Sequence, residues 1–65
     1  MKEYDCVEVI VEKEKYAREG VHKGMQGTIL DPRNIDGQWL VSFLDENGKE
    51  LQCLIREEDL FVYEK

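Results

Sequence analysis

Hydrophobic and polar residues alternate along most of this chain, with the period of two that β-strands show when one of their faces is buried. In the segment 6–12, β-branched valines fall on one face and glutamates on the other, which predicts the first strand. The same alternation recurs in later segments, separated by residues that favour turns. The predicted strands are 6–12, 26–30, 38–44, 49–56 and 61–63.

The turns between these segments have clear sequence signals. Gly20, Gly24 and Gly27 lead into the second strand, because glycine allows positive φ angles and a close approach of two backbones. Asp-Gly at 36–37 and Asn-Gly at 47–48 are typical of tight hairpins. We therefore expect two close hairpin connections around the third strand.

These elements predict an all-β fold, namely a small five-stranded SH3-like barrel with a long first loop and a short 3-10 turn before the last strand. The segment 13–19 carries mixed charge without a strand period, so we expect a loop there rather than a helical turn. The short turn is expected at 57–60. An oligonucleotide-binding barrel would need a helix for which there is no room between Phe43 and Leu51. Residues 1–65 are expected to form a single domain.

The alternation also separates an inner face of the predicted sheet from an outer one. A chain of 65 residues buries only about 60% of the surface that its unfolded form exposes, so we expect a thin core and a functional site on the surface. The residues expected in the core are Trp39, Val41, Phe43, Leu51, Cys53 and Ile55. The apolar residues left on the outer face are Ile10, Leu40, Leu44 and Leu54. These outer residues are either covered by loops or exposed side by side, as at a protein interface or a homodimer contact.

The charge of the chain is strongly acidic. Charged residues make up 37% of it and its formal net charge is -6, which opposes non-specific binding to nucleic acid. Cys6 and Cys53 are the two cysteines, and each lies in an apolar run where we expect a buried thiol. The sequence has no apolar leader and no run long enough to span a membrane, so we expect a reduced, cytoplasmic protein.

The glycines and the valine-rich first strand also carry a resemblance. The matching positions are Asp5 to Val9, Gly20-Val21, Gly24, Gly27-Thr28-Ile29-Leu30, Val41-Ser42-Phe43, Asp45 and Gly48. In these positions the chain resembles an uncharacterised, domain-of-unknown-function family of short bacterial SH3-like proteins. The stretch 23–29 is also similar to the KOW-type barrels of transcription and ribosome factors. Both resemblances rest on structural motifs, and neither implies a catalytic residue.

Few residues suggest chemistry. His22 is the single histidine and is expected in an exposed loop, without partners at the spacing of a metal site. Ser42 and Thr28 lack a neighbouring base, so we predict no catalytic residue, no metal and no cofactor. The acidic segments 45–47 and 57–59 are interpreted as solvated turns. Three aromatic residues are candidates for a peptide groove of the SH3 type, although a tryptophan in this position is more typical of a core. They are Tyr16, Trp39 and Tyr63.

The leading hypothesis is a non-enzymatic protein-binding module, such as an acidic inhibitor, immunity protein or adaptor for a basic protein partner. Complementary charge would speed the encounter, and a small apolar centre would hold the complex. The expected anchors are Leu40, Leu44 and Leu54. The carboxylates expected to attract the partner are Glu8, Glu12, Asp45, Glu46, Glu57, Glu58 and Asp59.

Two alternatives come from other classes of function. A KOW-like nucleic-acid or ribosome-associated factor would use basic residues of the first loop, and its affinity would fall steeply with salt. Those residues are Lys13, Lys15, Arg18 and Lys23. An accessory subunit of a multisubunit enzyme would instead remain bound to a larger subunit during purification.

Overall fold

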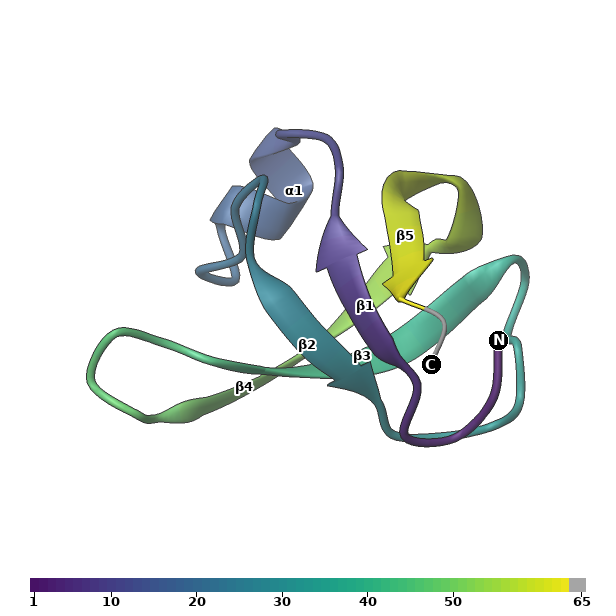
Figure 1. Cartoon of the computed structure of the whole chain (residues 1–65). Helices are drawn as coiled ribbons and strands as arrows, with labels where there is room; N and C mark the ends of the chain where they lie inside the picture. Colours follow the sequence, from purple (N-terminus) through teal and green to yellow (C-terminus); the bar gives the residue numbers. More distant parts are fainter. Residues whose placement is uncertain (64–65) are drawn as a thin grey trace.

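A computed structural model describes residues 1–63 of the chain as one antiparallel, five-stranded β-sheet (Figure 1). The strands are β1 (Cys6–Val9), β2 (Gln26–Ile29), β3 (Gln38–Leu44), β4 (Glu50–Arg56) and β5 (Leu60–Tyr63). A four-residue helix, α1 (Glu14–Ala17), lies between β1 and β2, and a 3-10 turn (Glu57–Asp59) lies between β4 and β5. The all-β prediction and the 3-10 turn are confirmed.

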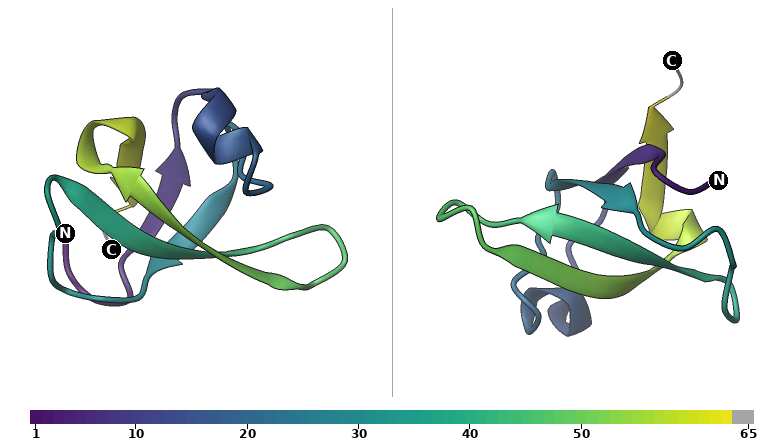
Figure 2. Two further views of the ribbon diagram at one scale, coloured as in Figure 1. Left: turned by 180° about the vertical axis from the view of Figure 1, so that it is seen from behind. Right: turned by 90° about the horizontal axis from the view of Figure 1, so that it is seen from below.

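The sheet has the strand order β4-β3-β2-β1-β5, so the last strand pairs with the first. It is strongly twisted, and β5 runs in a very different direction from the β3–β4 hairpin (Figure 2). The 3-10 turn therefore joins the two edge strands of the sheet. No ladder connects β4 to β5 within residues 1–63, and the sheet is open along this seam.

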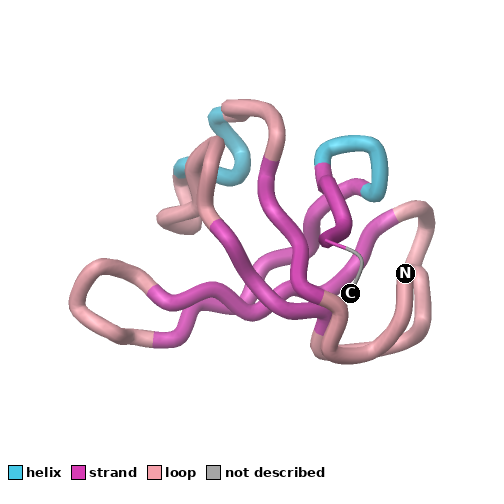
Figure 3. The backbone as a smooth tube through the Cα atoms, in the orientation of Figure 1, coloured by secondary structure: helices cyan, strands magenta, loops and turns pink. Residues whose placement is uncertain are grey.

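Hydrogen bonds from the loops hold the two ends of the sheet together near the 3-10 turn. The amide of Ile10 donates to the carbonyl of Asp59 at 3.0 Å, and the amide of Glu57 donates to the carbonyl of Gly37 at 2.9 Å. The 3-10 turn thus contacts both the start of the long loop, at Ile10, and the end of the β2–β3 connection, at Gly37. Figure 3 shows how much of the chain outside the strands is loop.

The core lies on the inner face of the sheet, where the alternation predicted it. Trp39, Val41 and Phe43 of β3 are buried, as are Cys53 and Ile55 of β4, and Leu51 packs partly buried against them. The buried cluster is completed by Val7, Val9, Tyr16, Val21, Ile29 and Leu60. Alternation predicted the inner residues of β3 and β4 because each strand exposes only one face.

Gly27 lets β2 approach β3 closely. A Cβ atom at this position would lie 2.6 Å from the carbonyl oxygen of Ser42 and 2.7 to 2.8 Å from side-chain atoms of Val41 and Phe43. Contacts this short do not occur with a real side chain, so only glycine fits at this point of the sheet. Packing therefore requires the glycine at position 27, whereas Gly20 and Gly24 have positive φ angles of +85° and +91°.

Three expectations about local structure were wrong. The segment 13–19 contains α1, which is held in place by the buried ring of Tyr16 and carries an exposed pair between Arg18 and Glu14 at 2.8 Å. The first strand ends at Val9 rather than at residue 12; the amide of Ile10 still bonds in register to Asp59, but Asp59 already belongs to the 3-10 turn and not to β5. Cys6 is exposed rather than buried, since it lies on the outer face of β1.

The helices in residues 1–63 are both very short, and neither has the length or the hydrophobicity needed to cross a membrane.

Candidate functional site

The three leucines predicted as anchors lie on the outer face of the β3–β4 hairpin. Leu40 and Leu54 are directly opposite each other, and Leu44 is opposite Glu50 near the turn. Leu44 is 67% exposed and Leu54 is 43% exposed, whereas Leu40 is half-buried. The cross-strand pair Ser42–Gln52 lies between the Leu40–Leu54 pair and Leu44, so Leu44 is about 13 Å from Leu40 along the strand. The structure therefore brings two of the anchors together and leaves the third apart on the same face.

The hydrogen-bonding pattern shows how closely Leu40 and Leu54 pack. The amide of Arg56 donates to the hydroxyl of Tyr16 at 3.1 Å, so it points away from β3. In an antiparallel pair, residues bond to the partner strand at every second position. Leu54 therefore also points its backbone away from β3, and the two leucines form a narrow, non-hydrogen-bonded pair with Cα atoms about 4.5 Å apart.

Two of the carboxylates expected to attract a partner stabilise loops. Asp45 accepts hydrogen bonds from the amides of Asn47 and Lys49, at 2.9 and 2.8 Å, which fixes the turn between β3 and β4. Glu12 accepts the amide of Lys23 at 2.9 Å and contacts the ring of His22 at 2.9 Å. The bond from the Lys23 amide, followed by that from His22, lowers the pKa of Glu12. His22 is exposed, as predicted.

Three further carboxylates also contact groups within the chain. Glu57 accepts the indole N–H of Trp39 at 3.2 Å, and Glu58 pairs with Arg56 at 2.5 Å. Glu8, on the outer face of β1, accepts the hydroxyl of Tyr63, and this bond raises the pKa of the tyrosine. Glu46 makes no side-chain contact of this kind within residues 1–63, and it is exposed at the hairpin turn.

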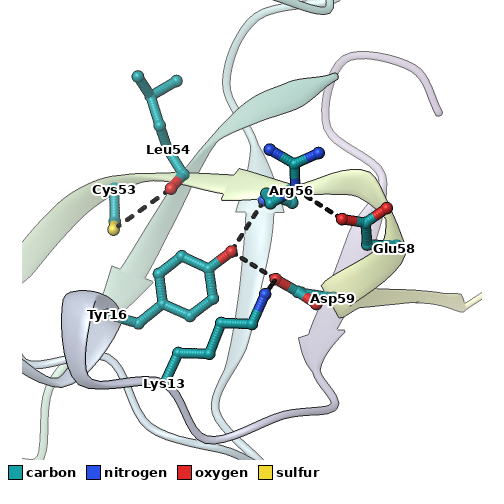
Figure 4. Close-up of polar contacts among 7 residues, drawn as sticks. All are labelled: Lys13, Tyr16, Cys53, Leu54, Arg56, Glu58 and Asp59. Atoms are coloured by element: carbon teal, nitrogen blue, oxygen red, sulfur yellow. Dashed lines mark hydrogen bonds and ion pairs between the residues drawn. The ribbon is translucent and has the colours of Figure 1, made fainter. Parts of the chain in front are cut away.

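Asp59 corrects the prediction that 57–59 is a solvated acidic turn, because its side chain is buried. Oδ2 of Asp59 accepts a hydrogen bond from the hydroxyl of Tyr16 at 2.6 Å and another from Nζ of Lys13 at 2.7 Å (Figure 4). The Tyr16 hydroxyl in turn accepts the amide of Arg56. The network links the long loop to β4 and to the 3-10 turn, so Asp59 stabilises the fold and is not available to a partner.

The ionisation of this network follows from its contacts. Burial raises the pKa of Asp59, but the hydrogen bonds from Lys13 and Tyr16 outweigh burial and hold it below the usual value. Burial, together with the hydrogen bond to Asp59, raises the pKa of Tyr16 to about 12. At neutral pH the carboxylate is therefore charged and the phenol is neutral.

The basic residues of the first loop are largely occupied by contacts within the chain. Lys13 pairs with Asp59, and Arg18 pairs with a glutamate of α1. The ammonium group of Lys15 lies 5.1 Å from the centroid of the Tyr16 ring. Lys15, Arg18 and Lys23 are exposed, whereas Lys13 is half-buried in its pair with Asp59.

The aromatic residues do not form the peptide groove suggested by the sequence. Tyr16 and Trp39 are buried in the core, which leaves Tyr63 as the exposed member of the three. Sequence reasoning missed Phe61, which is 54% exposed and packs edge to face against Tyr63 at 5.2 Å between centroids. Strand alternation could have identified Phe61, because burial of Leu60 on the inner face of β5 requires Phe61 to face outward.

No cluster of three or more His, Cys, Asp or Glu side chains within residues 1–63 is arranged to hold a metal ion. Ser42 donates to Glu50 at 2.7 Å, which is a contact between neighbouring strands on the outer face. Comparisons of this chain with known protein families, with characterised proteins and with solved structures gave no match. Function is therefore inferred from the residues and their geometry.

Proposed function

We propose that this chain is a non-enzymatic, protein-binding module, an acidic SH3-like barrel that captures a basic protein partner as an inhibitor, immunity protein or adaptor. The observation that carries the proposal is the apolar outer face of the β3–β4 hairpin, where Leu44 and Leu54 stay exposed on a chain with a net charge of -6. Apolar groups surrounded by charge are typical of protein interfaces.

In the proposed capture, the negative charge of the chain attracts the partner and the exposed leucines hold it. Most carboxylates already contact groups of the chain, so their collective field, rather than individual pairs, attracts the partner. Glu46 and Glu50 are exposed at the turn end of the hairpin, close to Leu44. Opposite charge speeds encounter, and burial of the leucines then slows dissociation.

The proposed barrel architecture is supported by the strand order and by the 3-10 turn between the edge strands. It also agrees with the resemblance to short bacterial SH3-like proteins. Both cysteines are free, which suits a cytoplasmic protein kept in a reducing compartment.

Affinity capture tests the proposal. The tagged chain is immobilised and exposed to a lysate of the cells in which it is native, with and without nuclease. The wild type is compared with the variant Leu40→Ser, Leu44→Ser, Leu54→Ser. The matched control is Ile35→Ser, because Ile35 is 51% exposed but lies outside the hairpin face. Circular dichroism checks that every variant is folded.

The proposal predicts a basic protein that stays bound after nuclease treatment, is lost with the triple variant and is retained by Ile35→Ser. Ribosomal proteins that disappear with nuclease would favour the KOW-like alternative. A large enzyme subunit in equal amount would favour the accessory role. A folded triple variant that captures the same basic protein would contradict the assignment of the leucines.

A further inference from the structure

Strand β4 has a free edge. The amide of Arg56 points away from β3. In an antiparallel ladder the backbone groups alternate in direction, so those of every second residue before Arg56 also point away from β3. The hairpin confirms this alternation from the other end, since the amide of Asp45 donates to the carbonyl of Lys49 at 2.9 Å. The outward-pointing residues are therefore Glu50, Gln52 and Leu54. No other strand within residues 1–63 pairs with this edge.

The free edge has defined ends. At one end the hydroxyl of Tyr16 occupies the amide of Arg56, and at the other the chain enters the hairpin turn. Between these ends the nearest contact to the edge is weak, from the Cys53 thiol to the carbonyl of Leu54 at 3.7 Å (Figure 4). The open stretch 50–54 has the length of an ordinary short strand.

A shallow groove runs beside this stretch. It is lined by Lys15, Tyr16 and Glu19 from the side of the long loop, by Gln52, Cys53 and Leu54 from β4, and by Gln38 and Leu40 from β3. A chain lying along the edge would direct alternate side chains to opposite faces. One set would lie beside Glu50, Gln52 and Leu54 on the outer face, and the other would lie on the side of the long loop, near Tyr16 and Cys53.

We infer that the free edge of β4 binds an extended segment of the basic partner, which adds to the sheet as a sixth strand. This inference rests on the proposed function and specifies where and how the partner binds. Backbone hydrogen bonds to Glu50, Gln52 and Leu54 supply affinity, as in other cases of strand addition. Basic side chains of the segment lie on the outer face beside the carboxylate of Glu50, and their aliphatic stems pack against Leu54, which is 43% exposed.

Charge favours this occupant over a second copy of the chain. Two copies would each bring a net charge of -6 to the contact. An antiparallel pairing of two β4 edges would also place no basic side chain opposite Glu50, because the outward-facing side chains of 50–54 are Glu, Gln and Leu. A segment in which lysine or arginine alternates with apolar residues avoids both costs.

Nuclear magnetic resonance of the ¹⁵N-labelled full chain tests the inference. The probe is an acetylated, amidated seven-residue peptide of alternating valine and lysine, and its counterpart replaces lysine with glutamate. We expect the lysine peptide to shift the amide signals of Glu50, Gln52 and Leu54 and to slow their hydrogen exchange. The glutamate peptide should leave these signals unchanged, because the chain is acidic.

Two variants of one position isolate the backbone contribution. Gln52→Pro removes an outward amide that β3 does not use, and proline is tolerated at such edge positions. Gln52→Ser keeps the amide and removes most of the side chain. The inference predicts that Gln52→Pro weakens peptide binding about tenfold, the loss of roughly one hydrogen bond, while Gln52→Ser stays close to the wild type.

The outcomes separate this inference from the proposed function. Peptide-induced shifts at Phe61 and Tyr63 without shifts at 50–54, or equal affinity of folded Gln52→Pro and wild type, would overturn strand addition and leave the module proposal standing. Absence of binding by the lysine peptide would also overturn strand addition. The proposed function is judged separately by the capture experiment with the leucine variant. The exchange measurement on the wild type gives an answer even if Gln52→Pro fails to fold.

Discussion

The hydroxyl of Tyr16 donates a hydrogen bond of 2.6 Å to Oδ2 of Asp59, although the two residues are 43 positions apart in the chain. Tyr16 belongs to the short helix of the long loop, and Asp59 closes the turn before the last strand. The bond therefore fixes a loop of 16 residues between β1 and β2 to the far end of the chain (residues 10–25). Its energetic role can be measured directly.

Tyr16→Phe should lower the free energy of unfolding by about 1–3 kcal/mol, because the buried carboxylate loses a donor and the amide of Arg56 loses its acceptor. Urea denaturation measures the change. Tyr4→Phe is the control, since Tyr4 is 69% exposed, and it should have almost no effect. Equal stability of the two variants would contradict a stabilising role for the network.

Acid should destabilise the protein partly through Asp59. Its pKa in the folded state lies below the usual value of 3.8, so its contribution is fully present above that value and is lost as the pH falls through the folded pKa. Urea denaturation at a series of pH values should show a smaller loss of stability below about pH 4 for Asp59→Asn than for the wild type. Parallel pH profiles would show that Asp59 has an unshifted pKa.

Alkali should act through Tyr16 with the opposite sign. A tyrosine whose pKa rises from 10.0 to about 12 on folding stabilises the protein below pH 10, and this contribution is lost between pH 10 and 12. Ultraviolet absorbance should therefore show one tyrosine of the native protein ionising last, after Tyr63, whose pKa is also raised by its bond to Glu8. Tyr16→Phe should remove that late phase, and its persistence would assign it to another residue.

Gly27→Ala should lower the free energy of unfolding by about 2–3 kcal/mol, because the new methyl group would overlap the carbonyl of Ser42 in the neighbouring strand. Gly48→Ala is the matched control. Gly48 has a φ of +80° and open space around it, so alanine there costs only the backbone strain of about 1 kcal/mol. A smaller loss for Gly27→Ala than for Gly48→Ala would contradict the close approach of β2 and β3.

The two thiols should differ in reactivity. Cys6 is exposed, whereas Cys53 is buried, and burial, with a smaller effect of Glu19, raises the pKa of the Cys53 thiol. A disulfide reagent at pH 8 should therefore modify one thiol quickly in the native protein and both in denaturant. Cys6→Ser should abolish the fast reaction. A fast reaction that survives this substitution would place Cys53 in an open site.

Much of the sheet could be predicted because strand alternation is a local property of the sequence. The bounds of β3 match the expected 38–44, and the inner residues of β3 and β4 are buried as expected. Alternation also determines two outward-facing residues. With Val7 on the inner face, Cys6 has to face outward, and the same reasoning applies to Phe61.

The parts that could not be predicted depend on contacts between distant segments. Asp59 resembles its neighbours Glu57 and Glu58 in the sequence, and only the approach of Tyr16 and Lys13 explains why it is buried. The helix α1 is similarly fixed by the burial of Tyr16 rather than by local propensity. Neighbouring carboxylates in a sequence can therefore differ in whether they are buried within the fold or exposed to a partner.

The pairing of β1 with β5 also determines when the protein can fold during its synthesis. Val7 and Val62 are partners in the ladder, so the first strand lacks one neighbour until the last strand has left the ribosome. Contacts this distant in sequence form late and slow the search for the native state. Nascent chains that still lack β5 have the backbone of β1 unpaired on one side, which makes them the form most open to chaperones and proteases.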